Sequence, residues 1–146
     1  MADIVMNQEE IKRILPHRDP MLLVDQVLQL SPMESAETTF YVRPDWDIFR
    51  GHFPGDPVLP GVLSVECIAQ AADVMIMTAE QYAGKTPLFA GIDKTRFRRK
   101  ISPGDTVVSK VQVSSVNQER GLIICSGQLF LGEELAVSAE ITVAMR

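Results

Sequence analysis

The chain has 146 residues, close to the length of one domain, and its composition of 46% hydrophobic and 23% charged residues is typical of a globular protein. Its formal net charge of −5 argues against a general electrostatic surface for nucleic acid or anionic membranes. Two cysteines far apart in the chain, Cys67 and Cys125, argue against a disulfide framework. No apolar run approaches the roughly 20 residues of a membrane span.

The sequence also lacks common targeting signals and cofactor-binding motifs. The N-terminus carries acidic residues where a secretory signal has a basic segment and a long apolar core. Without GxGxxG or GxxxxGK[ST], no cradle for nucleotide phosphates is evident, and without CxxC or HxxxH spacing no dedicated zinc site is expected. These features predict a cytoplasmic protein without a nucleotide cofactor.

The distribution of apolar residues predicts one short helix, one long helix and six strands. Asn7 and Glu10 have the spacing of a capping box for a helix that ends near Leu15, before Pro16. In residues 61–82, apolar side chains recur every three to four positions, the spacing of a buried helical face. Strands are predicted over residues 21–30, 36–42, 88–99, 106–116, 122–131 and 134–144.

The order of these elements predicts an α+β fold. Turn signals at residues 103–104, 117–121 and 132 separate the last strands, as antiparallel hairpins require. One buried helix with about six antiparallel strands indicates a sheet wrapped around a central helix, although periodicity leaves open a half-open barrel that carries a helix. Because no linker or repeat is evident, residues 1–146 are expected to form a single domain.

Glycine and proline concentrate in residues 51–61. This segment contains three of the nine glycines and three of the nine prolines. Such a segment is neither regular helix nor strand. It contains His52, whose imidazole suits proton transfer near neutral pH. Where the loop starts the long helix, free N–H groups at Gly61 and Val62 suit a carbonyl oxygen. Two interpretations stay open: a rigid loop that presents a catalytic histidine, or a structural turn with an incidental surface histidine.

Further along the helix, Glu66 is a candidate acid partner for His52. Glu66 shares one helical stripe with Gln70, Asp73 and Glu80, and periodicity alone favours a solvated polar face. If the stripe were covered, desolvation would raise the pKa of Glu66 and suit it to proton donation.

The other histidine and the helix methionines receive structural interpretations. His17 lies between a predicted helix end and a strand, and is expected to be a hydrogen-bonded structural histidine. Met75 and Met77 are expected to fill the core.

A basic run follows the long helix, where residues 93–100 carry five cations and one acid, a net charge of +4. The cations are Lys94, Arg96, Arg98, Arg99 and Lys100. On a regular strand, side chains two positions apart share a face, so all but Arg99 would align. The run suggests a docking surface for an acidic partner, and a solvated face is the other interpretation.

Three blocks of the sequence resemble the FabZ-type β-hydroxyacyl-[acyl-carrier-protein] dehydratases. They are ILPHRDPMLLVDQV at residues 14–27, GHFPGDPVLPGVLSVECIAQ at residues 51–70 and FAGIDKTRFRRKISPGD at residues 89–105. With the spacing between them, the resemblance covers nearly the whole chain, and the GHFPGxPxxPGV…E block is specific. The resemblance implies the hotdog fold, an antiparallel sheet around one long helix.

The resemblance also implies an activity, the dehydration of (3R)-3-hydroxyacyl chains on acyl carrier protein to trans-2-enoyl chains in type II fatty acid biosynthesis, with no cofactor and no metal. His52 would remove the C2 proton, and Glu66 would protonate the leaving C3 hydroxyl. Gly61, Val62 and Phe53 would bind the substrate, with an N–H near Gly61 on the thioester oxygen.

An assembly is implied as well. In the family, the residues matching His52 and Glu66 face each other from different chains across a dimer interface, which would cover the polar stripe, and three dimers commonly form a hexamer. The acidic carrier protein would dock on the basic run. Asp19, Met21 and Asp56 depart from the residues more common in the family, which leaves details of the acyl tunnel and its entrance open.

Three alternatives remain beside the dehydratase. Related isomerising enzymes carry Asp at the position of Glu66, so the glutamate favours plain dehydration, yet a bifunctional dehydratase/isomerase also fits. A hotdog acyl-thioesterase would use Glu66 to activate water and would release a free thiol. A non-catalytic module would bind carrier protein without turnover.

Overall fold

A computed structural model describes residues 5–146; residues 1–4, the start of the acidic N-terminus, lie outside the described residues. The helical elements are α1 (Gln8–Lys12), the short 3₁₀ turn η1 (Asp47–Arg50), α2 (Gly61–Met77) and a second 3₁₀ turn, η2 (Glu80–Tyr82). The strands are β1 (Gln26–Ser31), β2 (Ser35–Tyr41), β3 (Pro87–Phe97), β4 (Thr106–Asn117), β5 (Leu122–Leu131) and β6 (Glu134–Met145). No described helix has both the length and the apolar character needed to cross a membrane.

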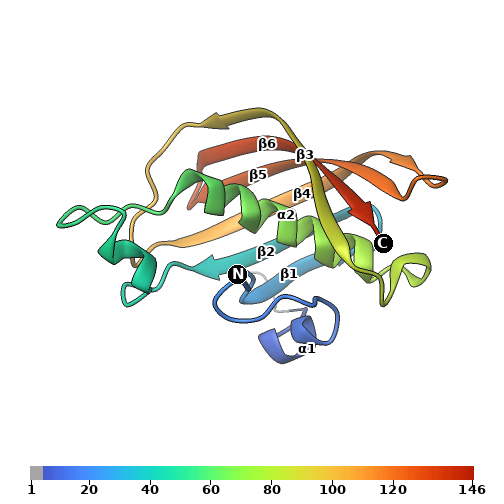
Figure 1. Cartoon of the computed structure of the whole chain (residues 1–146), viewed down its shortest axis with the longest axis horizontal. Helices are drawn as coiled ribbons and strands as arrows, with labels where there is room; N and C mark the ends of the chain where they lie inside the picture. Colours follow the sequence, from blue (N-terminus) through green and yellow to red (C-terminus); the bar gives the residue numbers. More distant parts are fainter. Residues whose placement is uncertain (1–4) are drawn as a thin grey trace.

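The six strands form one sheet in the order β1-β2-β4-β5-β6-β3, and every neighbouring pair is antiparallel. Helix α2 lies along one face of this sheet and packs on its central strands (Figure 1). The hairpins predicted for the last three strands therefore form, but β3 joins the sheet at the far side of β6, and its other edge has no partner strand among the described residues. The predicted sheet around a central helix is confirmed.

Helix α2 is buried on nearly all sides, with 13 of its 17 residues inaccessible, Met75 and Met77 among them. It ends at Met77, earlier than the predicted end near Tyr82, and the hydroxyl of the capping residue Thr78 donates to the carbonyl oxygens of Val74 and Met75. The chain then makes the separate turn η2. The apolar pattern beyond Met77 therefore reflects packing in a turn rather than a longer helix.

The predicted strand over residues 21–30 is half wrong, because pairing begins only at Gln26. Leu22, Leu23 and Val24 are buried, yet the backbone N–H of Leu23 donates to the side chain of Gln70 on α2 instead of to a strand. The apolar run thus marks a segment that covers the helix. The apolar pattern therefore predicted the burial of this segment correctly, but not its conformation.

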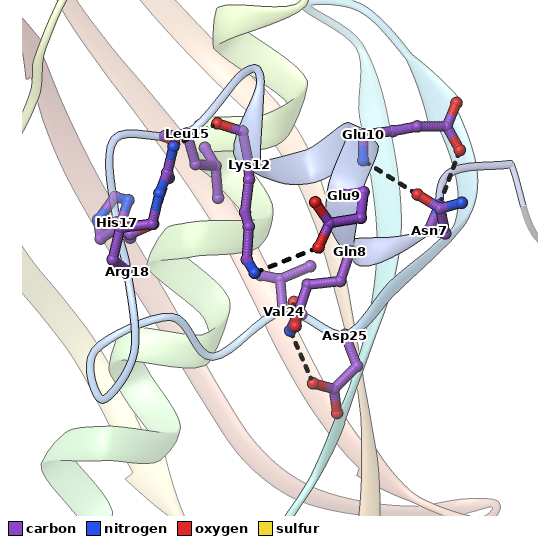
Figure 2. A network of polar contacts seen from close by, with 10 residues as sticks. All are labelled: Asn7, Gln8, Glu9, Glu10, Lys12, Leu15, His17, Arg18, Val24 and Asp25. Carbon is purple, nitrogen blue, oxygen red and sulfur yellow. Dashed lines mark hydrogen bonds and ion pairs between the residues drawn. The ribbon is translucent and has the colours of Figure 1, made fainter.

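Helix α1 and the segment between α1 and β1 are held by several hydrogen bonds (Figure 2). Asn7 and Glu10 form the predicted capping box, so α1 begins as expected. The Arg18 guanidinium donates to the carbonyl oxygens of Leu15, at 2.9 Å, and His17, at 2.7 Å. These bonds shape the loop that carries His17.

Candidate active site

His52 lies on a tight loop between η1 and α2. Pro54 and Gly55 occupy the centre of a turn closed by two hydrogen bonds between the backbones of Phe53 and Asp56, and the φ of +75° at Gly55 suits the third position of a type II turn. Beyond the turn, the Val58 N–H donates to the His52 carbonyl oxygen at 3.1 Å. The loop therefore holds His52 through bonds to residues close to it in sequence.

The side chain of His52 is also anchored to this loop. Its Nδ1 lies 2.8 Å from the carbonyl oxygen of Val58. Because a carbonyl can only accept, Nδ1 carries the proton and Nε2 is left as the basic nitrogen. Phe53 stacks on the imidazole, with ring centroids 3.9 Å apart. The half-buried ring is thus oriented as a proton acceptor.

The start of α2 offers unused backbone donors. Pro60 provides no side-chain cap, and the first helical bonds are donated by Leu63 and Ser64. Within residues 5–146, the N–H groups of Gly61 and Val62 have no acceptor. A Cβ on Gly61 would lie 2.9 Å from the ring of Phe97, so glycine permits this close packing beside the free donors.

Glu66 lies further along α2, in a polar cluster rather than in solvent. The Gln70 amide donates to Glu66 Oε2 at 2.7 Å and to the Met21 carbonyl oxygen at 2.7 Å, while its own oxygen accepts from the Leu23 N–H at 2.7 Å. Because Leu23 can only donate here, the amide orientation of Gln70 is determined and its nitrogen must face Glu66. Gln70 is fully buried. The loop over the helix therefore positions the glutamate.

Glu66 lines a cavity of about 40 Å³ behind it, together with His17 and Asp73. His17 Nε2 lies 3.9 Å from Glu66 Oε2 and 3.8 Å from Asp73 Oδ2. Burial raises the pKa of Glu66, against the opposing effect of the Gln70 hydrogen bond. Burial raises the pKa of Asp73 well above its ordinary value, and the charge of Glu66 adds to this. Both carboxyls therefore tend to keep their protons.

One sequence expectation is corrected by this cluster. The solvated stripe is wrong for Gln70 and Asp73, which are buried, and holds only for the exposed Glu80. The segment that covers the stripe belongs to the same chain, since Met21 and Leu23 bond to Gln70. Periodicity reports which residues share a helix face but not what packs on that face.

His17 is not the hydrogen-bonded structural histidine that was expected. Its Nδ1 is buried without a hydrogen-bond partner within the described chain. Burial and the nearby charge of Arg18 lower its pKa. Sequence reasoning missed His17 and Asp73 as members of the candidate site, because only the fold brings residues 56 positions apart to one cavity.

Within one chain, the structure does not bring His52 and Glu66 together. No hydrogen bond or ion pair between residues 5–146 joins the two side chains, and His52 does not line the cavity behind Glu66. His52 belongs to the loop before α2 and Glu66 to its second turn. The two side chains thus make no direct contact within the described chain.

The basic run does not form one aligned face. The pairing of β3 with β6 shifts register between Asp93 and Arg96, Lys94 adopts a φ of 47°, and β3 ends at Phe97. The predicted alternation is therefore wrong. Several of the cations also have acidic neighbours: Lys94 with Glu140, Arg99 with Glu134 and Lys100 with Asp56.

Arg98, Arg99 and Lys100 nevertheless lie together after the strand. They line a groove of about 430 Å³ with Gly61 and Phe97. The end of the basic run thus meets the start of α2, where the free backbone donors are. Two apolar side chains close in sequence to this part of α2 are also exposed: Phe53, and Val62 with 75% of its surface accessible.

The free edge of β3 carries exposed apolar side chains. Leu88, Ile92 and Phe97 are each at least half exposed, and Phe89 lines the cavity behind Glu66. An unpaired edge with apolar residues is a template for pairing with another strand. This edge runs directly beside the acid cluster.

Comparison with known proteins identifies the family. Residues 15–140 match the FabA-like domain. The 3-hydroxyacyl-[acyl-carrier-protein] dehydratase FabZ of Caldanaerobacter subterraneus subsp. tengcongensis is 41% identical over 96% of this chain and 98% of its own length. The protein of the same name from Symbiobacterium thermophilum is 42% identical over 90% and 92%.

A solved structure supports the fold. The dehydratase heterocomplex ApeI:P from Xenorhabdus doucetiae has a TM-score of 0.78 over 93% of this chain and 90% of that chain, at 19% sequence identity. The sheet wrapped around α2 is accordingly the hotdog fold. With the match to residues 15–140 and the identity to its relatives, the chain belongs to the FabA-like family and, within it, to the FabZ-type dehydratases.

Proposed function

We propose that this chain dehydrates 3-hydroxyacyl thioesters carried by acyl carrier protein, as a hydro-lyase of fatty acid biosynthesis. The observation that carries the proposal is a pair of groups with opposite proton demands. In the neutral imidazole of His52, Nε2 is the basic nitrogen, because Nδ1–H donates to the Val58 carbonyl oxygen. Burial raises the pKa of Glu66, which favours its protonated form. Elimination of water needs one base and one acid.

The proposed chemistry moves one proton to each group. His52 Nε2 removes the proton at C2, which the neighbouring thioester carbonyl acidifies. The thioester oxygen, as it gains enolate character, accepts hydrogen bonds from the free N–H groups at Gly61 and Val62. Glu66 gives its proton to the C3 hydroxyl, which leaves as water, and the trans-2-enoyl thioester remains. His52 then returns its proton to Glu66 through solvent, and no cofactor takes part.

We further propose that the acid and the base of one site come from two chains of a homodimer. The lack of direct contact between His52 and Glu66 in the described chain supports this, as does the apolar edge of β3 beside the Glu66 cavity. Pairing of two such edges would continue the sheet and bring the loop of one chain toward the helix of the other. Three dimers would form a hexamer.

The carrier protein is proposed to dock where the basic run meets α2. Arg98, Arg99 and Lys100 line the groove that also contains Gly61 and Phe97, which gives a thioester a path from an acidic partner to the free donors. Arg96 and Lys94 would extend the positive field along β3. With two free cysteines, we place the reaction in the cytoplasm.

Docking is tested by the salt dependence of KM. Arg98→Glu should raise KM for the carrier-protein substrate about tenfold at low salt, with a smaller effect at high salt because screening weakens the attraction. Arg120→Glu, a charge reversal in the turn between β4 and β5, is the matched control and should leave KM unchanged. Equal KM values for Arg98→Glu and wild type would contradict this docking surface.

The activity itself is tested by following product formation from a 3-hydroxyacyl carrier-protein thioester. Dehydration gives an enoyl thioester and leaves the thioester bond intact, so no free thiol should appear. Release of free thiol would instead identify an acyl-thioesterase. A cis-3-enoyl product would add isomerase activity, and binding without turnover would identify a non-catalytic module.

A further inference from the structure

We propose that Asp73 is a specificity-determining residue, which makes the inner end of the cavity behind Glu66 polar, so that the site favours acyl tails that are short or carry a hydroxyl over long apolar tails. The inference rests on the proposed contact between Glu66 and the C3 hydroxyl of the substrate. It adds a subsite for the part of the acyl chain beyond C3. The evidence is the position, the burial and the hydrogen-bonding capacity of the polar groups in that cavity.

The cavity lies beside the start of the acyl tail. Because Glu66 is the proposed partner of the hydroxyl on C3, the carbons beyond C3 begin next to this carboxyl. C2 and the thioester face His52 instead, and that histidine does not line the cavity. Glu66, Ala69 and Asp73 form one side of the cavity and follow one another on one face of α2, at intervals of three and four residues. The tail is therefore the part of the substrate that can enter and run along the helix toward Asp73.

Asp73 lies at the inner end of this cavity. Its side chain is 7% exposed, whereas the side chains of Glu66 and His17 are each 18% exposed. Ala69, between the two carboxyls on the helix face, is too small to close the space. The volume of about 40 Å³ holds only a few non-hydrogen atoms, since one water needs roughly 10–15 Å³. A tail that enters the cavity thus meets Asp73 within a few atoms of C3.

The inner end of the cavity has polar atoms that can bind a ligand. The Asp73 side chain has no hydrogen-bond partner within residues 5–146, and its Oδ2 lies 3.8 Å from His17 Nε2, beyond hydrogen-bond length. His17 Nε2 is likewise 3.9 Å from Glu66 Oε2. His17 Nδ1 is buried without a partner in the described chain. A group that both donates and accepts hydrogen bonds would therefore fit between Asp73 and His17.

The opposite wall of the cavity is apolar. Pro87 and Phe89 of β3 and Val143 of β6 line it. These side chains suit the methylene groups of an acyl chain and offer no hydrogen bond to the polar groups across the cavity. The polar character of the inner end therefore comes from Asp73 and His17, and Asp73 is the more buried of the two.

These contacts decide which tails fit. A long apolar tail would displace solvent from Asp73 and His17 without replacing its hydrogen bonds, and a buried polar group that loses its partner is destabilised. A short tail stops before these groups and leaves them hydrated. A tail with a hydroxyl at this depth can donate to one of them and accept from the other. Size and polarity therefore favour the same two kinds of tail.

The first test compares kcat/KM for 3-hydroxybutyryl and 3-hydroxydecanoyl thioesters of the carrier protein. Wild type should favour the short chain. Asp73→Val, which replaces the carboxyl with an apolar group of similar size, should raise kcat/KM for the long chain relative to the short one by about tenfold, chiefly through KM. Asp73→Asn keeps a polar group and should retain the wild-type preference. The same chain-length preference in wild type and Asp73→Val would overturn the proposal.

A control separates specificity from a general structural effect. Asp45→Val is the same replacement at an exposed aspartate and should keep the wild-type preference. If Asp73 only stabilised the fold, Asp73→Val would change the activity with both substrates by the same factor. Equal factors would therefore contradict a role of Asp73 in specificity.

A second test needs neither a variant nor turnover. Hexanoyl and 5-hydroxypentanoyl chains have the same number of non-hydrogen atoms and differ by a hydroxyl in place of a methyl group. Both are linked to pantetheine through an amide, and calorimetry measures their dissociation constants with the wild-type protein. We expect the hydroxylated probe to bind about tenfold more tightly. Equal affinities, tighter binding of the hexanoyl probe, or no binding of either would overturn the subsite.

The binding test also separates this inference from the proposed function. The two probes lack a C3 hydroxyl, so their affinities do not depend on proton transfer by Glu66. Tighter binding of the hydroxylated probe without dehydration of any thioester contradicts only the dehydratase. Dehydration with equal affinities for the two probes contradicts only the subsite.

Discussion

The loop around His52 and the cavity behind Glu66 are built in opposite ways. His52 itself is held by residues within six positions of it, through the Pro54-Gly55 turn and the bonds to Val58. The cavity assembles His17, Glu66 and Asp73 from segments joined only by the fold. The proposed base is thus held by local sequence, while the surroundings of the proposed acid depend on tertiary packing. Changes in the two regions should therefore have different costs.

His52 and Glu66 should be equally important for turnover, although their surroundings are built differently. We expect His52→Ala and Glu66→Gln each to lower kcat by about 10²–10⁴-fold, the usual contribution of a general acid or base. The free energy of unfolding should change little in either variant. Steady-state rates with Glu80→Gln as a control test this, and near-full activity in both variants would contradict the assigned roles.

Replacement of Gln70 tests how strongly the surroundings of Glu66 depend on tertiary contacts. In Gln70→Ala, the buried Leu23 N–H and the Met21 carbonyl oxygen lose their partners and a cavity opens, so the free energy of unfolding should fall by about 2–4 kcal/mol. Gln81→Ala, on an exposed turn, is the matched control. Denaturant unfolding measures both, and a loss below about 1 kcal/mol would show that the loop holds without this bond.

Asp73→Asn should have the reverse effect on stability. The pKa of Asp73 is raised in the folded state, so its contribution to stability is full below the unfolded pKa and is lost as pH rises toward the folded one. Asn has no such loss. The variant should therefore gain on wild type by about 1.4 kcal/mol per pH unit above roughly pH 4.

This gain is measured by chemical unfolding at several pH values. Asp45→Asn, at an exposed position, should show no pH-dependent difference. A difference between Asp73→Asn and wild type that does not grow with pH would mean that Asp73 is ionised in the folded protein.

The smallest effect is expected in the loop. Gly55→Ala places a side chain at a φ of +75° with no atom within 4 Å of the new Cβ, so only backbone strain of about 1 kcal/mol is added. Gly51→Ala, at a φ of −106°, lacks that strain and is the control. Thermal unfolding compares them, and equal midpoints would show that the loop does not require the turn conformation.

The same contrast explains what the sequence could predict. The start of α2 at Gly61, the capping box of Asn7 and Glu10, and the last strand, expected over residues 134–144, depend on local geometry and were predicted. The covering of Gln70 and Asp73 depends on which segment packs over the helix, and no local pattern contains that information. The aligned basic face failed at one bulge beside Lys94, because alternation holds only while a strand stays regular.

The resemblance supplied what local patterns could not. It proposes Glu66 as a site residue, where periodicity alone placed the side chain in solvent. It did not identify Asp73 or His17 as neighbours of that glutamate, because a family motif assigns roles to its own positions and not to the residues that pack behind them.

The central claim is that the locally built base and the tertiary acid cavity meet only between two chains. Mixing His52→Ala chains with Glu66→Gln chains, by denaturation and joint refolding, tests it most directly. Half of randomly formed dimers then contain one chain of each kind, and one of their two sites has both residues intact. We predict that the mixture regains about a quarter of wild-type activity. A mixture as inactive as its two components would contradict the shared site.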